Sequence, residues 1–534
     1  MASNLVFDPT HFESLIKKFG IKRAWINILA THISSLGFEF QYILEDKTFK
    51  GFTIQEDNLI SGLSIGEIGV LYEYCVAHVD ATSRKDNGQF FTPDDVAVLM
   101  VNHSKDFPKG KWLDPCSGIG NLSWHLVNFQ EDKEDFLINQ MILSDRDDLA
   151  LFIARVLFTL SFQKKHQDLY SEIEKSFVKL DFLSVAENNY QLSLGGSGLE
   201  AIPTHDYVIV NPPYLSIKGE DQRFETAKSR DLYAYFLENI IKTSKGFISI
   251  TPQSFTNAGK FESLRRLMLE RYDSLKIYTF DNIPGNIFFG VKFGSTNSNT
   301  ANSIRACIVV AGSSISTTGH QITSLLRWKT SEREAFFSQL DQFLSKPKLT
   351  SEYFPKVNSK FIALYNKVNK LPKLESILSP SPTEFVLYVP SAPRYFISAL
   401  KKSVSRTSLK TLYFQNNTDL NKAYLLLNSS FMYWWWRVRD GGMTLSFETI
   451  KSLPLLEFEI DKKLVNKLVK SETSNVVFKM NAGALQENVK HDSALIKEIN
   501  ELVAPQYSKL LILTHENSDL IYLKAPKVKS SKEI

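Results

Sequence analysis

Apolar runs and amphipathic stretches alternate along the middle of this chain. Runs that predict buried strands occur at 111–113, 136–143, 177–180, 207–210, 246–252 and 304–311. Stretches with apolar residues at helical spacing follow three of these runs, at 121–128, 149–162 and 231–241. Because strands that alternate with helices form parallel sheets covered by helices, the pattern predicts an α/β fold.

The N-terminal part predicts helices. Apolar residues recur at helical spacing over 11–36 and again over 66–79. The run 88–100 predicts another helix, in which Thr92 suits the N-cap and Pro93 the first helical position. This is the pattern of a well-capped helix, and its exposed start could also close over a ligand.

The length of 534 residues is too great for one hydrophobic core, so several domains are expected. We expect an N-terminal helical segment at 1–65, a larger domain at 66–330 and a C-terminal α+β domain at 331–534. No apolar run reaches transmembrane length and the N-terminus lacks the pattern of a signal peptide. Three scattered cysteines form neither a disulfide framework nor a zinc motif, which is typical of the reducing cytoplasm.

Charge is unevenly distributed along the chain. Residues 1–330 hold 33 Lys and Arg against 38 Asp and Glu, whereas residues 331–534 hold 29 against 20. A basic C-terminal part on a mildly acidic body favours a module that binds a polyanion such as nucleic acid. A solvated basic surface would explain the same counts.

The most informative stretch follows the strand predicted at 207–210. It reads Asn211-Pro212-Pro213-Tyr214, and the two prolines end the strand in a rigid corner. The Asn211 side chain and the carbonyl of Pro212 could both accept hydrogen bonds from one amino group. Tyr214 could stack on the ring that carries this amino group. The corner therefore suits the exocyclic amine of a nucleobase, although a simple strand-ending turn would have the same sequence.

Three acids follow three successive predicted strands. Asp114 precedes a turn with two glycines and suits a cationic amino group, while Asp145 lies where a carboxylate could bind ribose hydroxyls. Asp181 could accept from an adenine amino group while Phe182 packs on its ring. A solvated carboxylate at a strand end explains each acid singly, but three in succession favour a nucleoside-bearing ligand.

With these motifs in this order, residues 88–312 resemble the γ-group of amino-type DNA methyltransferases, which methylate adenine N6. The resemblance implies a Rossmann-like domain that binds S-adenosylmethionine. It assigns cofactor binding to Gln89, Phe91, Thr92, Pro93, Asp114, Pro115, Ser117, Gly118, Gly120, Asp145, Asp181, Phe182 and Asn211. It assigns catalysis to Asn211, Pro212, Pro213, Tyr214 and Phe288, with Phe289 as the competitor of Phe288 for the ring that stacks on the flipped base. It implies no metal.

The C-terminal part resembles the target-recognition domains of restriction-modification enzymes only loosely. Basic residues interleave there with aromatic residues, as expected of a surface that follows phosphates. They are Arg394, Lys401, Lys402, Arg406, Lys410, Arg437 and Arg439. Of the tryptophans 434–436, we expect at least two in a core, and Gly441-Gly442 predicts a turn.

The resemblance implies a cytoplasmic enzyme that methylates adenine N6 at specific sites in double-stranded DNA by base flipping. Such an enzyme would be the modification enzyme of a restriction-modification system, with a separate restriction endonuclease as a conceivable partner. Cytosine-N4 methylation uses the same corner, and related corners act on RNA or on protein glutamine. A specificity protein with an inactive methylase domain is the non-enzymatic alternative. Cytosine-C5 chemistry is disfavoured because the only Pro-Cys pair, Pro115-Cys116, lies inside the predicted cofactor loop.

Overall fold

The computed structural model describes most of the chain. The described residues are 6–7, 10–79, 91–162, 168–184, 202–288, 292–293, 304–313, 319–393, 397–406, 408–440, 444–481 and 483–516. The chain divides into two compact units. The first comprises 1–255, 259–277 and 286–320, and the second 256–258, 278–285 and 321–534. The N-terminal helices thus lie in the same unit as most of the strands, and residues 321–330 lie in the second unit.

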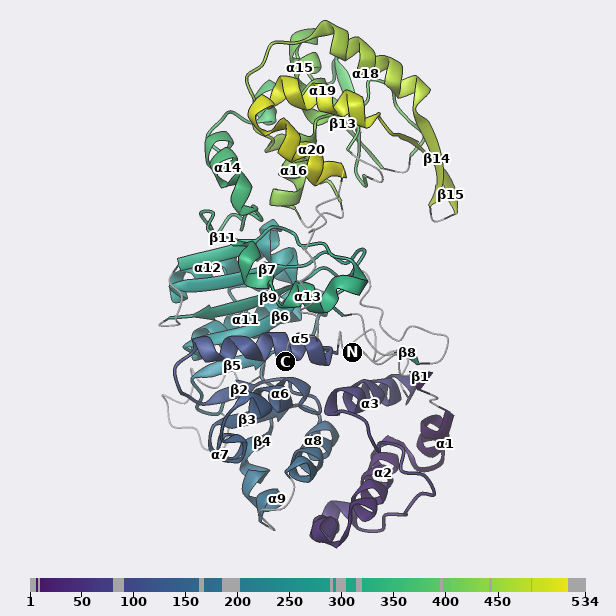
Figure 1. Ribbon diagram of the computed structural model, residues 1–534, viewed down its shortest axis with the longest axis vertical. Helices are drawn as coiled ribbons and strands as arrows, with labels where there is room; N and C mark the ends of the chain where they lie inside the picture. Colours follow the sequence, from purple (N-terminus) through teal and green to yellow (C-terminus); the bar gives the residue numbers. More distant parts are fainter. Residues whose placement is uncertain are drawn as a thin grey trace, which may run out of the picture. The chain divides into compact units, whose positions relative to one another are not determined.

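A sheet of nine strands is the main feature of the fold (Figure 1). The strands are β2 (Trp112–Asp114), β3 (Met141–Asp145), β4 (Phe177–Lys179), β5 (Tyr207–Val210), β6 (Gly246–Pro252), β7 (Ser274–Thr279), β9 (Ala306–Gly312), β10 (Gly319–Thr323) and β11 (Leu344–Ser345). Their order is β11-β10-β7-β9-β6-β5-β2-β3-β4. Strands β4, β3, β2, β5 and β6 are parallel, whereas β9 runs antiparallel to β6. The predicted α/β fold with a mostly parallel sheet is confirmed.

The order of the parallel strands reverses direction at one point. From β2 the chain proceeds to β3 and β4 on one side, and later to β5 and β6 on the other. The connections after β2 and β5 therefore lead away from each other. In open α/β sheets, ligands bind in the crevice at the carboxyl ends of such strands.

Helices connect the strands and cover the sheet. In the first unit they are α5 (Asp94–Val101), α6 (Asn121–Phe129), α7 (Lys133–Asn139), α8 (Asp148–Ser161), α9 (Leu169–Glu172), α11 (Leu232–Thr243) and α12 (Glu262–Arg271). The helices predicted at 121–128, 149–162 and 231–241 are confirmed to within two residues.

One predicted strand is wrong in its first half. The run 136–143 is apolar except for Asn139 and Gln140, and the structure divides it there between the end of α7 and the start of β3. Asp132 is the N-cap of α7, and its side chain accepts a hydrogen bond from the backbone N–H of Asp135 at 3.1 Å. A short apolar run cannot by itself distinguish a buried strand from a buried helical turn.

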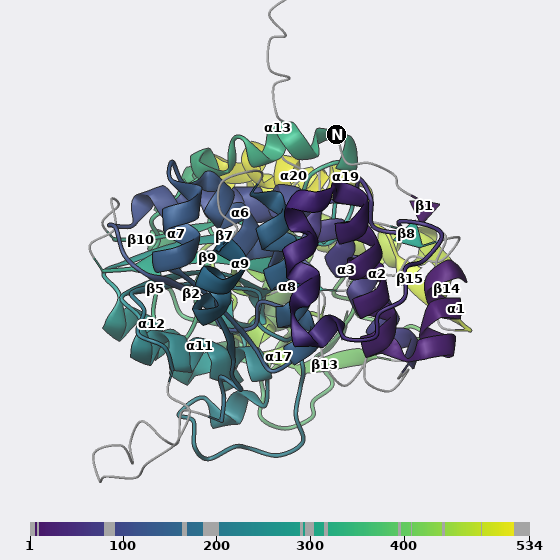
Figure 2. The same cartoon turned by 90° about the horizontal axis from the view of Figure 1, so that it is seen from below.

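The N-terminal helices are α1 (Thr10–Phe19), α2 (Ile21–Leu36) and α3 (Ile65–Val79). Trp25 of α2 is fully buried and meets the ring of Tyr72 edge to face, with centroids 5.5 Å apart. Helix α2 also lies beside α8, as Figures 1 and 2 show. Strand β1 (Val6–Phe7) pairs in parallel with β8 (Lys292–Phe293). This segment is therefore part of the first unit.

The second unit contains helices and two hairpins. The helices are α13 (Arg333–Phe337), α14 (Ile362–Val368), α15 (Asn417–Leu427), α16 (Ser430–Arg439), α17 (Phe447–Lys451), α18 (Lys462–Ser474), α19 (Ser493–Val503) and α20 (Ser508–Glu516). The hairpins pair β12 (Val386–Pro390) with β13 (Leu409–Tyr413), and β14 (Val476–Asn481) with β15 (Ala484–Val489). All three tryptophans 434–436 are buried in the core of this unit, as expected of at least two.

Several of the basic residues predicted to follow phosphates instead stabilise the second unit. Arg437 is buried and its guanidinium lies 2.8 Å from the carboxylate of Asp281. The guanidinium of Arg439 stacks on the ring of Tyr353, 3.4 Å from its centroid. Arg406 donates to the side chain of Asn488 at 2.6 Å. The prediction was wrong for the buried Arg437, because an interleaved aromatic–basic pattern also describes a core whose cations are paired, whereas phosphate contact by the partly exposed Arg406 and Arg439 stays a prediction.

Of the other basic residues in that set, Lys402 is exposed, whereas Lys401 and Lys410 are partly buried. Arg394 and the predicted turn at Gly441-Gly442 lie outside the described residues. Within the described ranges, no helix is long and apolar enough to cross a membrane.

Candidate functional site

The predicted ligand residues lie at one edge of the sheet. Asp114 and Asp145 are the last residues of β2 and β3, and Asn211 directly follows β5. Asp181 comes two residues after β4. Since these strands are parallel and neighbouring, their carboxyl ends meet at the same edge.

The turn after β2 is held close to β3. The backbone N–H of Ser117 donates to the carbonyl of Ser144 at 3.0 Å. Gly118 and Gly120 have φ of 53° and 88°, in the left-handed region that favours glycine. A Cβ on Gly120 would also lie 2.9 Å from the side chains of Leu143 and Phe158, whereas one on Gly118 would meet no atom within 4 Å. The turn therefore packs tightly on its Gly120 side and is open at Gly118.

Asp145 ties this turn to the helix that follows β3. One carboxylate oxygen accepts from the backbone N–H of Gly118 at 2.8 Å, and the other from the N–H of Asp147 at 2.9 Å. Burial raises the pKa of the Asp145 carboxyl. Each carboxylate oxygen has a second lone pair, so binding of ribose hydroxyls stays a prediction that the geometry allows.

Asp114 is almost completely buried beneath the same turn. Its carboxylate accepts a hydrogen bond from the Ser123 hydroxyl at 2.9 Å. Burial, together with a smaller effect of the nearby Asp145, raises the pKa of Asp114 to about 7, although the hydrogen bond from Ser123 acts in the opposite direction. A positively charged ligand group at this position would offset the cost of ionising a buried carboxyl.

The acid and ring after β4 are arranged differently from each other. Asp181 is exposed, and its carboxylate accepts from the backbone N–H of Leu183 at 3.1 Å. Phe182 is 1% exposed, and its ring stacks on Phe236 of α11 with centroids 5.5 Å apart. Asp181 is thus accessible to a ligand, whereas contact of the Phe182 ring with an adenine ring would require that ring to be uncovered first.

Thr92 corrects one prediction from the sequence. Pro93 occupies the N-cap of α5 and no side chain caps that helix. The Thr92 hydroxyl instead accepts a hydrogen bond from the side-chain nitrogen of Asn211 at 2.9 Å, and its carbonyl accepts from the side chain of Asn121 at 2.9 Å. Thr92 therefore joins the corner after β5 to the start of α6, and a capping rule that considers only local sequence could not find this contact.

The corner after β5 also contacts the turn after β2. The Cys116 thiol donates to the backbone carbonyl of Asn211 at 3.3 Å. Asn211 is thus held through its side-chain nitrogen by Thr92 and through its carbonyl by Cys116. Nothing local in the sequence indicated the Cys116 contact, since the two residues are 95 positions apart.

The aromatic residues near the corner meet edge to face. The ring centroid of Tyr214 lies 6.1 Å from that of Phe288 at 62°, and 6.4 Å from that of Tyr233 at 81°. The Tyr214 hydroxyl donates to the carbonyl of Ile250 at 2.8 Å. A base between two parallel rings needs centroids about 7 Å apart, because each contact takes about 3.5 Å. Tyr214 and Phe288 would have to turn to accept one, so the sandwich stays a prediction.

The remaining predicted site residues are placed as follows. Phe91 is partly buried, and a Cβ on Gly69 of α3 would lie 3.2 Å from its ring. Phe288 is buried and its backbone N–H donates to the Asn286 side chain at 2.8 Å. Gln89 and Phe289 lie outside the described residues. In the part of the chain that the structure describes, no group of three or more His, Cys, Asp and Glu could hold a metal ion.

Comparisons with known proteins bear on this arrangement. Residues 139–288 match the family model described as Eco57I restriction-modification methylase. The Type II methyltransferase M.PstI of Providencia stuartii is 25% identical over 221 residues, which cover 38% of this chain and 40% of the relative. The Type II methyltransferase M.BanIII of Aneurinibacillus aneurinilyticus is 26% identical over 258 residues, which cover 39% of each chain.

The match is therefore partial, and the aligned region spans about 40% of the length of these curated relatives. Among solved structures, the ATP-dependent Type ISP restriction-modification enzyme LlaBIII bound to DNA has a TM-score of 0.41 at 13% identity, covering 92% of this chain and 39% of that one. The resemblance of this chain to methyltransferases of restriction-modification systems, which its motif order indicated, is confirmed by the match of residues 139–288 to the Eco57I restriction-modification methylase family.

Proposed function

We propose that the chain transfers the methyl group of S-adenosylmethionine to N6 of adenine in double-stranded DNA, as the modification enzyme of a restriction-modification system. The observation that carries this proposal is the corner at Asn211, held by Thr92 and Cys116 at the point where the strand order reverses. The matched relatives, whose names describe them as Type II methyltransferases, support methyl transfer.

The buried acids fit the proposed cofactor. S-adenosylmethionine supplies a methyl group on a sulfonium, and it carries a cationic amino group, a ribose and an adenine. Asp114 suits the amino group, because a cation would stabilise the ionised form of a carboxyl whose pKa burial raises to about 7. Asp145 lies one strand further along and suits the ribose hydroxyls, and the exposed Asp181 suits the adenine amino group. The open side of the turn at Gly118 allows the ligand to approach the backbone.

Asn211 would act on the target amine. The lone pair of an exocyclic amine is delocalised into the base, so the nitrogen is a poor nucleophile until its hydrogens leave the plane of the ring. The carbonyl oxygen of the Asn211 side chain and the carbonyl of Pro212 would each accept a hydrogen bond from one of these two hydrogens. Because Thr92 holds the side-chain nitrogen of Asn211, the amide is oriented with its oxygen as the acceptor. Positioning of this kind stabilises the transition state without a covalent intermediate.

DNA enters the proposal in two ways. The target amine is not accessible within a duplex, so the adenine would flip out and rest against Tyr214. Residues 331–534 would form the target-recognition domain, supported by their excess of 29 Lys and Arg over 20 Asp and Glu. Since several arginines there are paired internally, the DNA contacts would come from exposed cations such as Lys402.

The test is to incubate the purified chain with S-adenosylmethionine and plasmid DNA, and to read the modified bases by single-molecule sequencing. N6-methyladenine at one sequence motif is the expected result, and Asn211→Ala should remove it. N4-methylcytosine would transfer the proposal to the other amino-type reaction. Labelling of RNA or protein, or cofactor and DNA binding without any transfer, would refute DNA methylation by this chain.

A further inference from the structure

Side chains on one face of α11 hold the loop between Tyr214 and that helix in place. Asp231, Tyr235, Glu238 and Lys242 are spaced by four, three and four residues, so they lie on one face of α11 and its N-cap. Apolar residues such as Ile240 and Ile241 are buried as well. Helix α11 is therefore covered on more than one side, with a polar face toward the loop 215–231.

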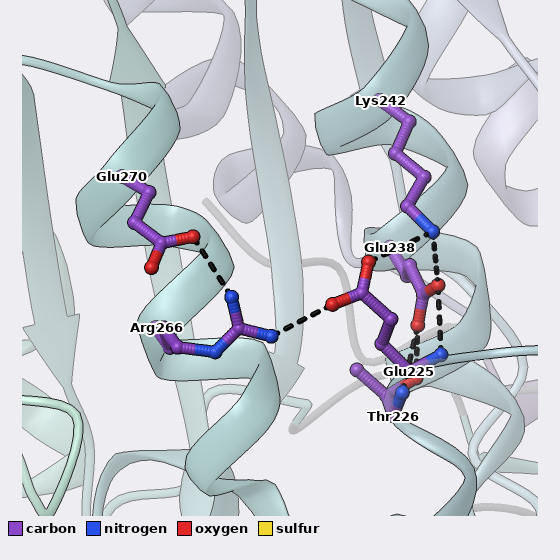
Figure 3. Close-up of polar contacts among 6 residues, drawn as sticks. All are labelled: Glu225, Thr226, Glu238, Lys242, Arg266 and Glu270. Atoms are coloured by element: carbon purple, nitrogen blue, oxygen red, sulfur yellow. Dashed lines mark hydrogen bonds and ion pairs between the residues drawn. The ribbon is translucent and has the colours of Figure 1, made fainter.

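Glu238 is the centre of this polar face (Figure 3). It is fully buried, and one carboxylate oxygen accepts from the backbone N–H of Glu225 at 3.0 Å and from the Lys242 ammonium at 2.6 Å. The other oxygen accepts from the backbone N–H and the hydroxyl of Thr226, both at 2.8 Å. A buried carboxylate is costly unless hydrogen bonds satisfy it, and here the loop supplies three of them.

The contacts around Glu238 close the rest of the loop. Tyr235 donates to the carbonyl of Ala227 at 3.1 Å, and its ring stacks on Phe224 at 4.4 Å and 1°. At the base of the loop, the backbone N–H of Leu232 donates to the carbonyl of Leu215 at 2.9 Å. The side chain of Asp231 accepts from Ser216 at 2.5 Å. The loop is thus tied to α11 at its middle and at both ends.

The outer ion pairs of the same network are of a different kind. Arg266 bridges Glu225 at 2.7 Å and Glu270 at 2.9 Å (Figure 3). Glu225, Arg266 and Glu270 are 44%, 43% and 58% exposed. Exposed pairs contribute little, about 0–1 kcal/mol. Among the acids of this network, Glu238 is therefore the one on which the folding of the middle of the loop depends, and Glu270 provides a matched control.

We infer that Glu238 is a positioning residue for the proposed methyl transfer, which holds the loop 215–231 against α11 and so fixes the DNA-facing side of the corner at Tyr214. This inference rests on the proposed function. The loop begins at the residue after Tyr214 and carries the exposed cations Lys218 and Lys228, which suit the phosphates beside a flipped nucleotide, whereas the exposed Arg230 pairs with Glu220 of the same loop at 3.3 Å. The acids and turn assigned to the cofactor follow other strands. Phe236, on which the ring of Phe182 stacks, is also in α11, but residues two apart lie on different faces of a helix. We therefore expect Glu238 to affect use of DNA and not binding of the cofactor.

The test compares Glu238→Gln with Glu270→Gln in the full chain. In Glu238→Gln, the side-chain NH2 group faces the N–H, hydroxyl and ammonium groups that donate to Glu238 in the wild type. The same change at Glu270 removes only its exposed ion pair with Arg266. We expect Glu238→Gln to lower kcat/KM for DNA at least tenfold, with the dissociation constant for S-adenosylmethionine within twofold of wild type. Trypsin should cut faster after Lys228 and Arg230. Glu270→Gln should match wild type in all three measurements.

A second variant guards against a general folding defect. Thr226→Val keeps the shape of the side chain and removes one of the four hydrogen bonds to Glu238. It should show the same selective loss for DNA, to a smaller degree. Equal losses for DNA and cofactor, or normal kcat/KM in both Glu238→Gln and Thr226→Val, would overturn the inference. An inactive wild type that binds the cofactor would instead refute the proposed function, and the positioning role with it.

Discussion

The contact between Thr92 and Asn211 leads to a sharp prediction. Thr92→Val keeps the shape of a buried β-branched side chain but removes the hydroxyl that accepts from the Asn211 side-chain nitrogen at 2.9 Å. The proposed mechanism requires the oxygen of that amide to face the target amine. Without the Thr92 hydroxyl, the Asn211 amide loses the hydrogen bond that fixes which of its ends, nitrogen or oxygen, faces the target amine.

The magnitude follows from the cost of losing that bond. Removing one partner of a buried polar group costs about 1–3 kcal/mol. Because about 1.4 kcal/mol is a tenfold change in rate, the methyl-transfer rate should fall about 5- to 150-fold. Thr92→Ser retains the hydroxyl and is the matched control, which should keep most of the activity.

The assay is single-turnover methylation of a cognate duplex at saturating S-adenosylmethionine, because this isolates the transfer step from product release. Calorimetric titration of the cofactor should give an affinity near that of wild type. The reason is that the Thr92 carbonyl still accepts a hydrogen bond from Asn121 and keeps the start of α6 in place. Turnover of Thr92→Val equal to wild type would refute the orienting role. A loss of equal size in Thr92→Ser would mean that packing of the methyl group, and not the hydrogen bond, is what matters.

Three further predictions follow from the site and the core. Asn211→Ala should abolish methyl transfer in a steady-state methylation assay, at a cost of about 3 kcal/mol or more in the transition state. Tyr214→Phe keeps the stacking ring and should retain most activity in the same assay. If both variants are equally inactive, the Tyr214 hydroxyl has a chemical role beyond its hydrogen bond to Ile250. Because the pKa of Asp114 is raised to about 7, affinity for S-adenosylmethionine in calorimetry should fall by up to tenfold per pH unit below that value, and Asp114→Asn should remove this dependence. For the same raised pKa, the stability that Asp114 contributes is present at acidic pH and is lost as pH rises from about 4 toward 7. Arg437→Met should lower the free energy of unfolding of the second unit by up to about 3–5 kcal/mol, since the buried Asp281 loses one cation and keeps Arg327 at 3.3 Å. A melting temperature equal to wild type would contradict that reasoning.

The sequence alone determined the features that depend on neighbouring residues. An apolar run followed by Asp114 and a glycine turn, and another followed by Asn211-Pro212-Pro213, predicted strand ends that the structure confirms. Helices α6, α8 and α11 were predicted from spacing because their apolar periods are long and regular. The order of these motifs also indicated the methyltransferase resemblance, since motif order is itself a property of the sequence.

Only the tertiary structure decided which of these residues touch. The bond between Thr92 and Asn211 joins positions 119 residues apart, and the one between Arg437 and Asp281 joins positions 156 apart. Local rules assigned Thr92 to a helix cap and Arg437 to a phosphate surface, because each rule evaluates a side chain without its distant partners. Which partner a polar side chain acquires depends on how the strands and helices pack, and burial then makes satisfying its hydrogen bonds obligatory.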